Sequence, residues 1–182
     1  AINLLAKLTG WEHNVRYVSR NSAPRKVYEA KLAKTHKRSR INQMFYGSGK
    51  FYTSKASDFD SLIVDEAHRL TAKSGMYYKG ENQIKEIIHA SNFSVFFLDE
   101  DQRVTMQDIG DAETIRNFVK ELGAEVVELE LESQFRCNGS DGYLAWLDDV
   151  LQIRQTANPV LTDIEYDFKI FDDPAELHAF IT

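Results

Sequence analysis

Cysteine is scarce in this sequence, and long apolar runs and a secretory leader are absent. The 182 residues contain a single cysteine, Cys137, which excludes a disulfide framework and a zinc site made of several cysteines. The longest apolar runs, such as residues 95–98, are far shorter than the roughly 20 residues that span a bilayer. The first residues show neither the basic nor the apolar region of a secretory signal. We therefore expect a protein of the reducing cytoplasm that has no membrane partner.

Charge is distributed unevenly along the chain. Hydrophobic residues make up 43% and charged residues 27%, with a net charge of −6, and both fractions are ordinary for a globular domain. Residues 1–55, however, hold 12 of the 22 Lys and Arg residues and only 2 of the 28 Asp and Glu residues. This basic first third suits the phosphates of a nucleic acid. A solvated helix face is the alternative interpretation.

Strand patterns alternate with helix patterns over the first 130 residues. Strands are expected at 14–19, 44–46, 61–65, 94–99 and 124–129, and helices at 1–8, 24–37, 83–90 and 111–122. Such alternation predicts βαβ units, and therefore an α/β fold with a doubly wound parallel sheet. Ligands of such sheets bind at the carboxyl ends of the strands. The acidic residues that follow two of the strands, at 65–66 and 99–102, are therefore the places where we expect a site.

The pattern changes after residue 133. A helix is expected at 139–151, then a polar connector, a strand at 166–171 and a helix that begins with Asp173 as N-cap and Pro174 in the first turn. One strand and one short helix cannot form a core of their own. Because residue 1 also falls within a helical pattern, we expect a domain that is incomplete at both ends.

The strongest chemical signal is an apolar strand that ends in two adjacent carboxylates, Asp65 and Glu66. An aspartate at this place can hold Mg²⁺ through its water shell. The neighbouring glutamate can orient and deprotonate the water that attacks a γ-phosphate. The alternative is a strand that merely ends in a solvated acidic turn.

Two weaker signals follow along the chain. The next strand brings Asp99 and Gln102 to the same sheet edge, where the glutamine amide can contact a γ-phosphate or the attacking water. Arg136 follows the strand expected at 124–129, and a guanidinium there can stabilise charge on a transferring phosphoryl group. A surface turn and an interdomain ion pair are the respective alternatives.

The segment Gly47-Ser48-Gly49-Lys50 imitates a phosphate loop. A true phosphate loop has the pattern G-x-x-x-x-G-K followed by Ser or Thr and opens a helix. Here Met44 stands at the first glycine position and Phe51 at the hydroxyl position, and the flanking aromatic residues favour extended chain. We do not expect this segment to bind phosphate.

Three segments together resemble one known family in order and spacing. They are Val64-Asp65-Glu66-Ala67-His68-Arg69-Leu70, Leu98-Asp99-Glu100-Asp101-Gln102 and Ser133-Gln134-Phe135-Arg136-Cys137-Asn138. They resemble the schlafen group 3-like DNA/RNA helicase domains, which are P-loop ATPases similar to superfamily 1 helicases. The resemblance covers essentially the whole chain. It implies a RecA-like P-loop NTPase core over 1–138, a helix and linker over 139–159, and the start of a second RecA-like domain over 160–182.

The resemblance also implies roles for individual residues. Asp65 would be the Walker B metal residue and Glu66 the catalytic base. His68 and Asp99 would lie at the nucleotide site, where His68 couples it to neighbouring segments. Gln102 would sense the γ-phosphate, and Arg136 would reach it. Nucleic acid would lie near the end of the first strand and the basic helix after it, at Ser19, Arg20, Asn21, Arg25 and Lys26.

One departure from the family limits these expectations. The Walker A lysine and its Ser or Thr do not occur in these 182 residues. ATP and Mg²⁺ are therefore expected cofactors of the complete protein, and none is expected to bind this chain by itself. The leading hypothesis is a nucleic-acid-dependent ATPase, such as a helicase or translocase acting on DNA or RNA. An ATP-driven switch and a non-enzymatic nucleic-acid-binding module are the alternatives.

Overall fold

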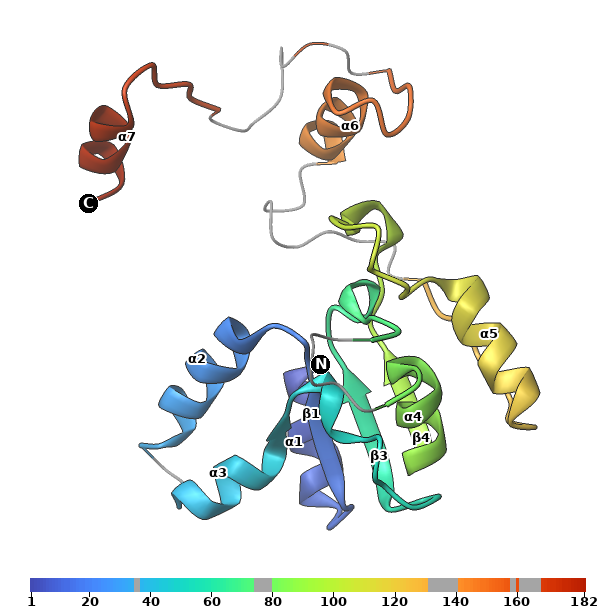
Figure 1. The fold of residues 1–182 in the computed structure, drawn as a ribbon. Coiled ribbons are helices and arrows are strands. Elements are labelled where there is room, and N and C mark those ends of the chain that lie inside the picture. The colour runs from blue at the N-terminus through green and yellow to red at the C-terminus, as the bar shows by residue number, and fades with distance from the viewer. Residues whose placement is uncertain (35–36, 74–79, 131–140, 158–159, 161–167) are drawn as a thin grey trace. The chain divides into compact units, whose positions relative to one another are not determined.

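The computed structural model describes residues 1–34, 37–73, 80–130, 141–157, 160 and 168–182. The chain divides into two compact units, Ala1–Val127 and Glu128–Thr182 (Figure 1). Each unit is described by itself below.

A parallel sheet is the centre of the first unit. Its strands are β1 (Val15–Val18), β2 (Phe45–Tyr46), β3 (Phe59–Val64) and β4 (Ser91–Phe96). Among the described residues they form one sheet in the order β2-β1-β3-β4, and every pairing is parallel. In register, Val64 lies opposite both Val18 and Phe96. The carboxyl ends of β1, β3 and β4 therefore meet at one edge.

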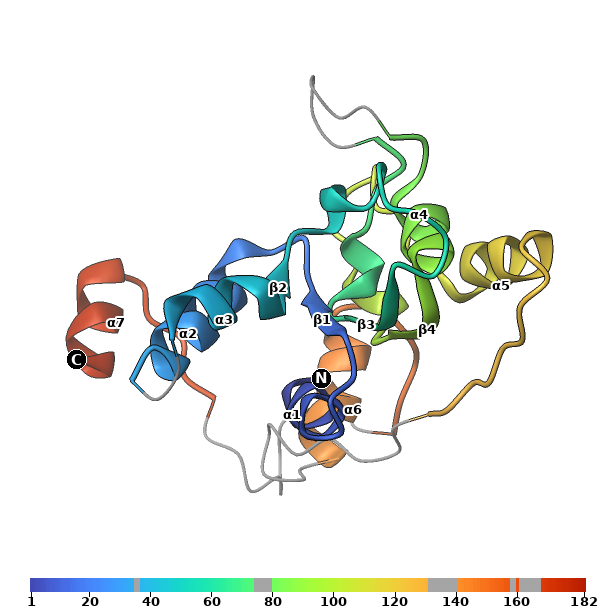
Figure 2. The same ribbon diagram turned by 90° about the horizontal axis from the view of Figure 1, so that it is seen from below.

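Helices cover both faces of this sheet (Figures 1 and 2). They are α1 (Ile2–Gly10), α2 (Ser22–Leu32), α3 (Arg38–Met44), α4 (Gln83–Ala90) and α5 (Ala112–Glu121). Successive residues of β3 alternate between two apolar clusters: Leu62 and Val64 pack with α4 and α5, and Ile63 packs with α1, α2 and α3. This alternation is the two-residue period of a strand that is buried on both faces. The expectation of an α/β, doubly wound, RecA-like fold is thereby confirmed.

The basic helix expected at 24–37 is shorter, and a further helix that was not expected follows it. The first, α2, ends at Leu32, and Lys37 has the extended backbone (φ −64°, ψ 137°) that precedes α3. Between Leu32 and Ile41 the sequence offers no large apolar side chain and several like charges. A helix through this stretch would have nothing to bury and would gather repelling cations on its surface.

The strand expected at 124–129 does not form. This stretch has no regular secondary structure, and Val127 and Leu129 are 84% and 91% exposed. Alternating apolar residues make a strand only when a neighbouring strand takes up their backbone hydrogen bonds, and β3 is the one strand paired with β4 among the described residues. The helix before it is as expected, since α5 ends just ahead of Gly123, whose φ of +68° suits glycine.

The second unit contains α6 (Asp141–Val150) and α7 (Pro174–Ile181). Both helices were expected, and Asp173 accepts a 2.7 Å hydrogen bond from the backbone N–H of Ala175, as an N-cap does. Residues 168–171, the described part of the strand expected at 166–171, are not a strand. The division into a linker over 139–159 and a second RecA-like domain over 160–182 stays a prediction. Within the described ranges of both units, no helix has the length and apolar character needed to cross a membrane.

Candidate functional site

The two carboxylates after β3 are held at the edge where the strands end. The backbone N–H of Asp65 donates to the carbonyl of Val18 at 2.8 Å, which extends the pairing of β1 with β3 by one residue. Glu66 has the left-handed backbone (φ 56°, ψ 47°). This conformation is uncommon and costs a non-glycine residue about 1–2 kcal/mol. Such strain persists where the surroundings fix the residue, and it often marks a functional site.

A buried tyrosine holds the first carboxylate. The Tyr17 hydroxyl donates a 2.6 Å hydrogen bond to Asp65 Oδ2. Tyr17 lies on β1, is fully buried, and has its ring against those of Tyr28 and Phe45. Burial raises the pKa of the Tyr17 hydroxyl. The hydrogen bond to Asp65 and the negative charge of Asp65 raise this pKa further. The hydroxyl therefore stays protonated and acts as a donor to the carboxylate.

A histidine links the second carboxylate to the next strand. His68, which is buried in the short 3₁₀ helix η2 (Ala67–Arg69), lies with Nε2 at 3.0 Å from Glu66 Oε2. Its Nδ1 accepts from the backbone N–H of Asp99 at 3.4 Å. With Nδ1 acting as an acceptor, the ring proton is assigned to Nε2, which faces the Glu66 carboxylate. His68 thus contacts both the Glu66 side chain and the backbone of Asp99, and it bridges the segments after β3 and β4.

The segment after β4 is arranged around Asp99. Gln102, at the end of the 3₁₀ helix η3 (Glu100–Gln102), donates from Nε2 to Asp99 Oδ2 at 2.6 Å, and Asp99 Oδ1 accepts from the backbone N–H of Asp101. Gln102 is exposed. Its amide therefore lies at the surface beside the Asp99 carboxylate, where it can exchange this hydrogen bond for one to another group.

Arg20 lies directly after β1 and is bound by a buried carboxylate. Its Nη1 contacts Asp108 Oδ1 at 2.9 Å and also donates to the carbonyl of Arg69. The other oxygen of Asp108 lies 3.3 Å from Arg69 Nε and accepts the backbone N–H groups of Val104 and Thr105. Asp108 thereby joins the ends of β1 and β3 to the loop that follows Gln102.

These bonds decide the charge state of Asp108. Its burial would by itself raise the pKa of the carboxyl. The hydrogen bonds from Thr105 and Val104 and the charge of Arg69 outweigh that effect, so the pKa is lowered. Asp108 is therefore an anion that compensates two partly exposed arginines.

The residues expected to meet nucleic acid differ in exposure. Ser19 is fully buried, whereas Asn21 and Lys26 are exposed and Arg25 is half-buried. The Arg25 guanidinium donates from Nε to the carbonyl of Asn21 at 3.3 Å. The basic side chains that face solvent in this region are Lys26, Lys31, Lys34, Lys37, Arg38 and Arg40.

Two other expected features can be placed briefly. Arg136 lies outside the described residues. The segment 47–50 forms the single 3₁₀ turn η1 (Ser48–Lys50) rather than the start of an α-helix, and the Lys50 ammonium lies 4.6 Å from the centre of the Tyr46 ring. Ser48 is buried.

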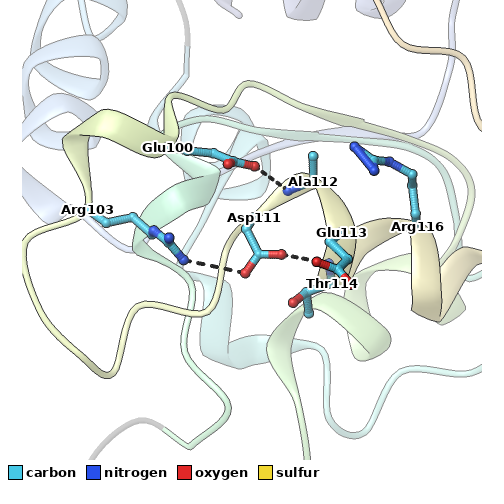
Figure 3. A pocket seen from close by; sticks show the side chains of 7 residues that line it. All are labelled: Glu100, Arg103, Asp111, Ala112, Glu113, Thr114 and Arg116. Carbon is cyan, nitrogen blue, oxygen red and sulfur yellow. Dashed lines mark hydrogen bonds and ion pairs between the residues drawn. The ribbon is translucent and has the colours of Figure 1, made fainter. Parts of the chain in front are cut away.

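A polar hollow of about 440 Å³ lies at the start of α5 (Figure 3). Asp111 caps this helix by accepting from the backbone N–H of Thr114 at 2.6 Å, and Glu100 accepts from the backbone N–H of Ala112 at 2.7 Å. The Nη1 atom of Arg103 lies 3.5 Å from Oδ2 of Asp111. Two of the donors that this helix N-terminus offers to an anion are therefore already used by the protein's own carboxylates.

The carboxylates suit a magnesium ion that is held mainly by phosphates and water. Among the described residues, no group of three or more His, Cys, Asp or Glu side chains is placed to hold a metal by itself. Mg²⁺ commonly takes one or two carboxylates and completes its shell with waters and substrate phosphates. Asp65 has one oxygen fixed by Tyr17. Within the described part of the chain, its Oδ1 has no hydrogen bond, so the residue fits this kind of ligand.

The family model of the schlafen group 3 DNA/RNA helicase domain matches residues 1–182. The chain belongs to this family. No curated protein and no solved structure matches it. The resemblance carried by the three sequence segments is thereby confirmed. The site described above is the carboxyl edge of a schlafen group 3 helicase-like domain.

Reasoning from the sequence missed two residues of this edge, Tyr17 and Asp108. Tyr17 stands in an apolar strand, where a tyrosine is ordinary, and the one available signal was a polar group at a position expected to be buried on both faces. Asp108 stands in an irregular segment with no pattern around it. Its two arginine partners are distant in sequence, so no local signal could have identified it.

Proposed function

We propose that this schlafen group 3 helicase-like domain serves a nucleic-acid-dependent ATPase that works as a helicase or translocase on DNA or RNA. One observation carries the proposal: Asp65 and Glu66 lie together at the carboxyl end of β3, Asp65 held by the Tyr17 hydroxyl and Glu66 in contact with the His68 imidazole. In this proposal Asp65 holds Mg²⁺, and the ion neutralises charge on the phosphates. Glu66 orients and deprotonates the attacking water.

The neighbouring residues have supporting roles in the proposal. His68 holds the Glu66 carboxylate and ties it to Asp99. Gln102 exchanges its bond to Asp99 for one to the γ-phosphate or to the attacking water, and in this way reports which nucleotide is bound. Arg136 contributes a positive charge to the transferring phosphoryl group.

ATP turnover by the complete natural protein tests the proposal. Glu66→Gln removes the base and keeps the shape of the side chain, so hydrolysis should fall by about 10²–10⁴-fold while ATP binding is kept. Glu125→Gln is the matched control, because Glu125 is an exposed residue in the irregular stretch after α5. Near-wild-type turnover in Glu66→Gln would remove Glu66 from the catalytic role.

The salt dependence of nucleic-acid binding tests the second half of the proposal. Between residues 22 and 44 the sequence has seven basic residues and one acidic residue, and α2 buries no side chain. We propose that this surface contacts the backbone of a single strand. Each phosphate contact on a single strand adds about 0.7 to the slope of log affinity against log salt. Replacing Lys31, Lys34 and Lys37 with glutamine should flatten that slope, and an unchanged slope would favour a merely solvated surface.

A strand-displacement assay separates this function from the other candidates. A helicase displaces a strand only while it hydrolyses ATP. An ATP-driven switch shows turnover without displacement, and a non-enzymatic binding module retains nucleic-acid binding in Glu66→Gln without ATP.

A further inference from the structure

Tyr17 occupies a place from which its hydroxyl can reach the metal-binding carboxylate. It lies opposite Ile63 in the register of β1 and β3. Asp65 follows Ile63 by two residues, so the two-residue period of a strand puts the side chains of Tyr17, Ile63 and Asp65 on the same face of the sheet. The result is the 2.6 Å hydrogen bond from Tyr17 Oη to Asp65 Oδ2.

Packing fixes the tyrosine ring and therefore the place of its hydroxyl. The Tyr17 ring is 5.5 Å from that of Phe45 and 5.9 Å, edge to face, from that of Tyr28. Its side chain has no exposure to solvent. The donor thus comes from the rigid centre of the sheet, whereas the acceptor, Asp65, is half-buried at the edge.

We propose that Tyr17 is the positioning residue of the metal-binding carboxylate, fixing Asp65 Oδ2 so that Oδ1 faces the metal. This inference rests on the proposed role of Asp65 in holding Mg²⁺. Partners of a metal ligand orient it and set its basicity, and their loss typically lowers metal affinity or activity about 10–100-fold. In this view β1, which precedes the residues expected to meet nucleic acid, is linked to the metal-binding carboxylate by one buried hydroxyl group.

The decisive variant is Tyr17→Phe in the complete natural protein. It keeps the ring and its packing and removes one hydroxyl group. The Mg²⁺ concentration that gives half-maximal ATP hydrolysis should rise about 10–100-fold, and turnover at saturating Mg²⁺ should change much less.

Tyr28→Phe is the matched control, since this ring packs against Tyr17 and Phe45 and its hydroxyl has no bond to Asp65 within the described structure. It should leave the Mg²⁺ requirement unchanged. The melting temperature of each variant separates metal positioning from a general loss of stability. A merely structural hydroxyl would lower the melting temperature and leave the Mg²⁺ requirement as it was.

Three results would count against the inference in different ways. Tyr17→Phe with a wild-type Mg²⁺ requirement, in a protein that hydrolyses ATP, would overturn this inference alone. If Tyr17→Phe does not fold, the NMR resonance of the Tyr17 hydroxyl proton in the wild-type protein decides. It should shift when Mg²⁺ and ATP are added, because its acceptor Asp65 then holds the ion, and an unchanged resonance overturns the inference. A folded wild-type protein that hydrolyses no ATP with any single strand would overturn the proposed function, and this inference with it.

Discussion

The two units of the chain contain helices of similar length, but the helices bury very different amounts of surface. In the first unit, Ile84, Ile87 and Ala90 of α4 have no exposure to solvent. In the second unit, Phe180 and Ile181 of α7 are 59% and 69% exposed, and no described residue there is buried. Both helices begin with a side-chain cap, Asn82 for α4 and Asp173 for α7. Local signals thus suffice to start a helix, whereas burial needs a sheet to pack against.

The largest effect is expected from a substitution in the core that distinguishes the first unit. Leu62→Ala removes a fully buried side chain from the centre of β3 and should lower the free energy of unfolding by about 2–5 kcal/mol. Leu177→Ala in α7, where the side chain is 44% exposed, should change it by less than about 0.5 kcal/mol. Denaturant unfolding followed by circular dichroism measures both. Equal losses would mean that the second unit has a core of comparable quality.

A second prediction concerns a close backbone contact in the first unit. Gly110 is buried, and a Cβ there would overlap the carbonyl oxygen of Ala67, a backbone atom that cannot turn aside. Gly110→Ala should therefore cost about 3 kcal/mol and displace η2, which carries His68. Gly10→Ala is the control, because nothing lies within 4 Å of its would-be Cβ. A melting temperature for Gly110→Ala equal to that of Gly10→Ala would contradict the contact.

A third prediction concerns the buried carboxylate of Asp108. Asp108→Asn loses the charge-assisted hydrogen bond to Arg20 and the ion pair with Arg69 and should cost about 2 kcal/mol at neutral pH. The lowered pKa of Asp108 means that the folded state favours the anion. This stabilisation is complete above the unfolded pKa of about 3.9 and is lost as the pH falls through the lower folded pKa. The stability difference between wild type and variant should therefore shrink in acid, and a constant difference from pH 7 to pH 2 would refute it.

The smallest effects are expected from removing the aspartate cap of one helix in each unit. Asp111→Ala removes the cap of α5 and should lower the stability of the first unit by about 1 kcal/mol. Asp173→Ala removes the same kind of bond from α7. It should reduce the helicity of that segment and leave the unfolding midpoint of the first unit unchanged. Amide hydrogen exchange resolves the two segments, and a shift of the first unit's midpoint by Asp173→Ala would show that the units unfold together.

The sequence predicted the site's acidic residues because their signal is local. An apolar run that ends in acids is read within seven residues, and β3 with Asp65 and Glu66 and the end of β4 with Asp99 were both found in this way. The failures came where a local pattern lacked a partner. The alternation at 124–129 met no neighbouring strand, and the basic run after Leu32 had no apolar side chain with which to continue the helix.

The sequence by itself therefore determined the parallel α/β architecture, the order of β1 to β4 along the chain, and the carboxylates at the sheet edge. Only the tertiary structure decided what holds them. Tyr17 and Asp65 are 48 residues apart, and Arg20 and Asp108 are 88 apart. Periodicity reports which face a residue takes, but not which distant group it meets there. That meeting is set by strand register and by the packing of buried rings, which exist only once the sheet has formed.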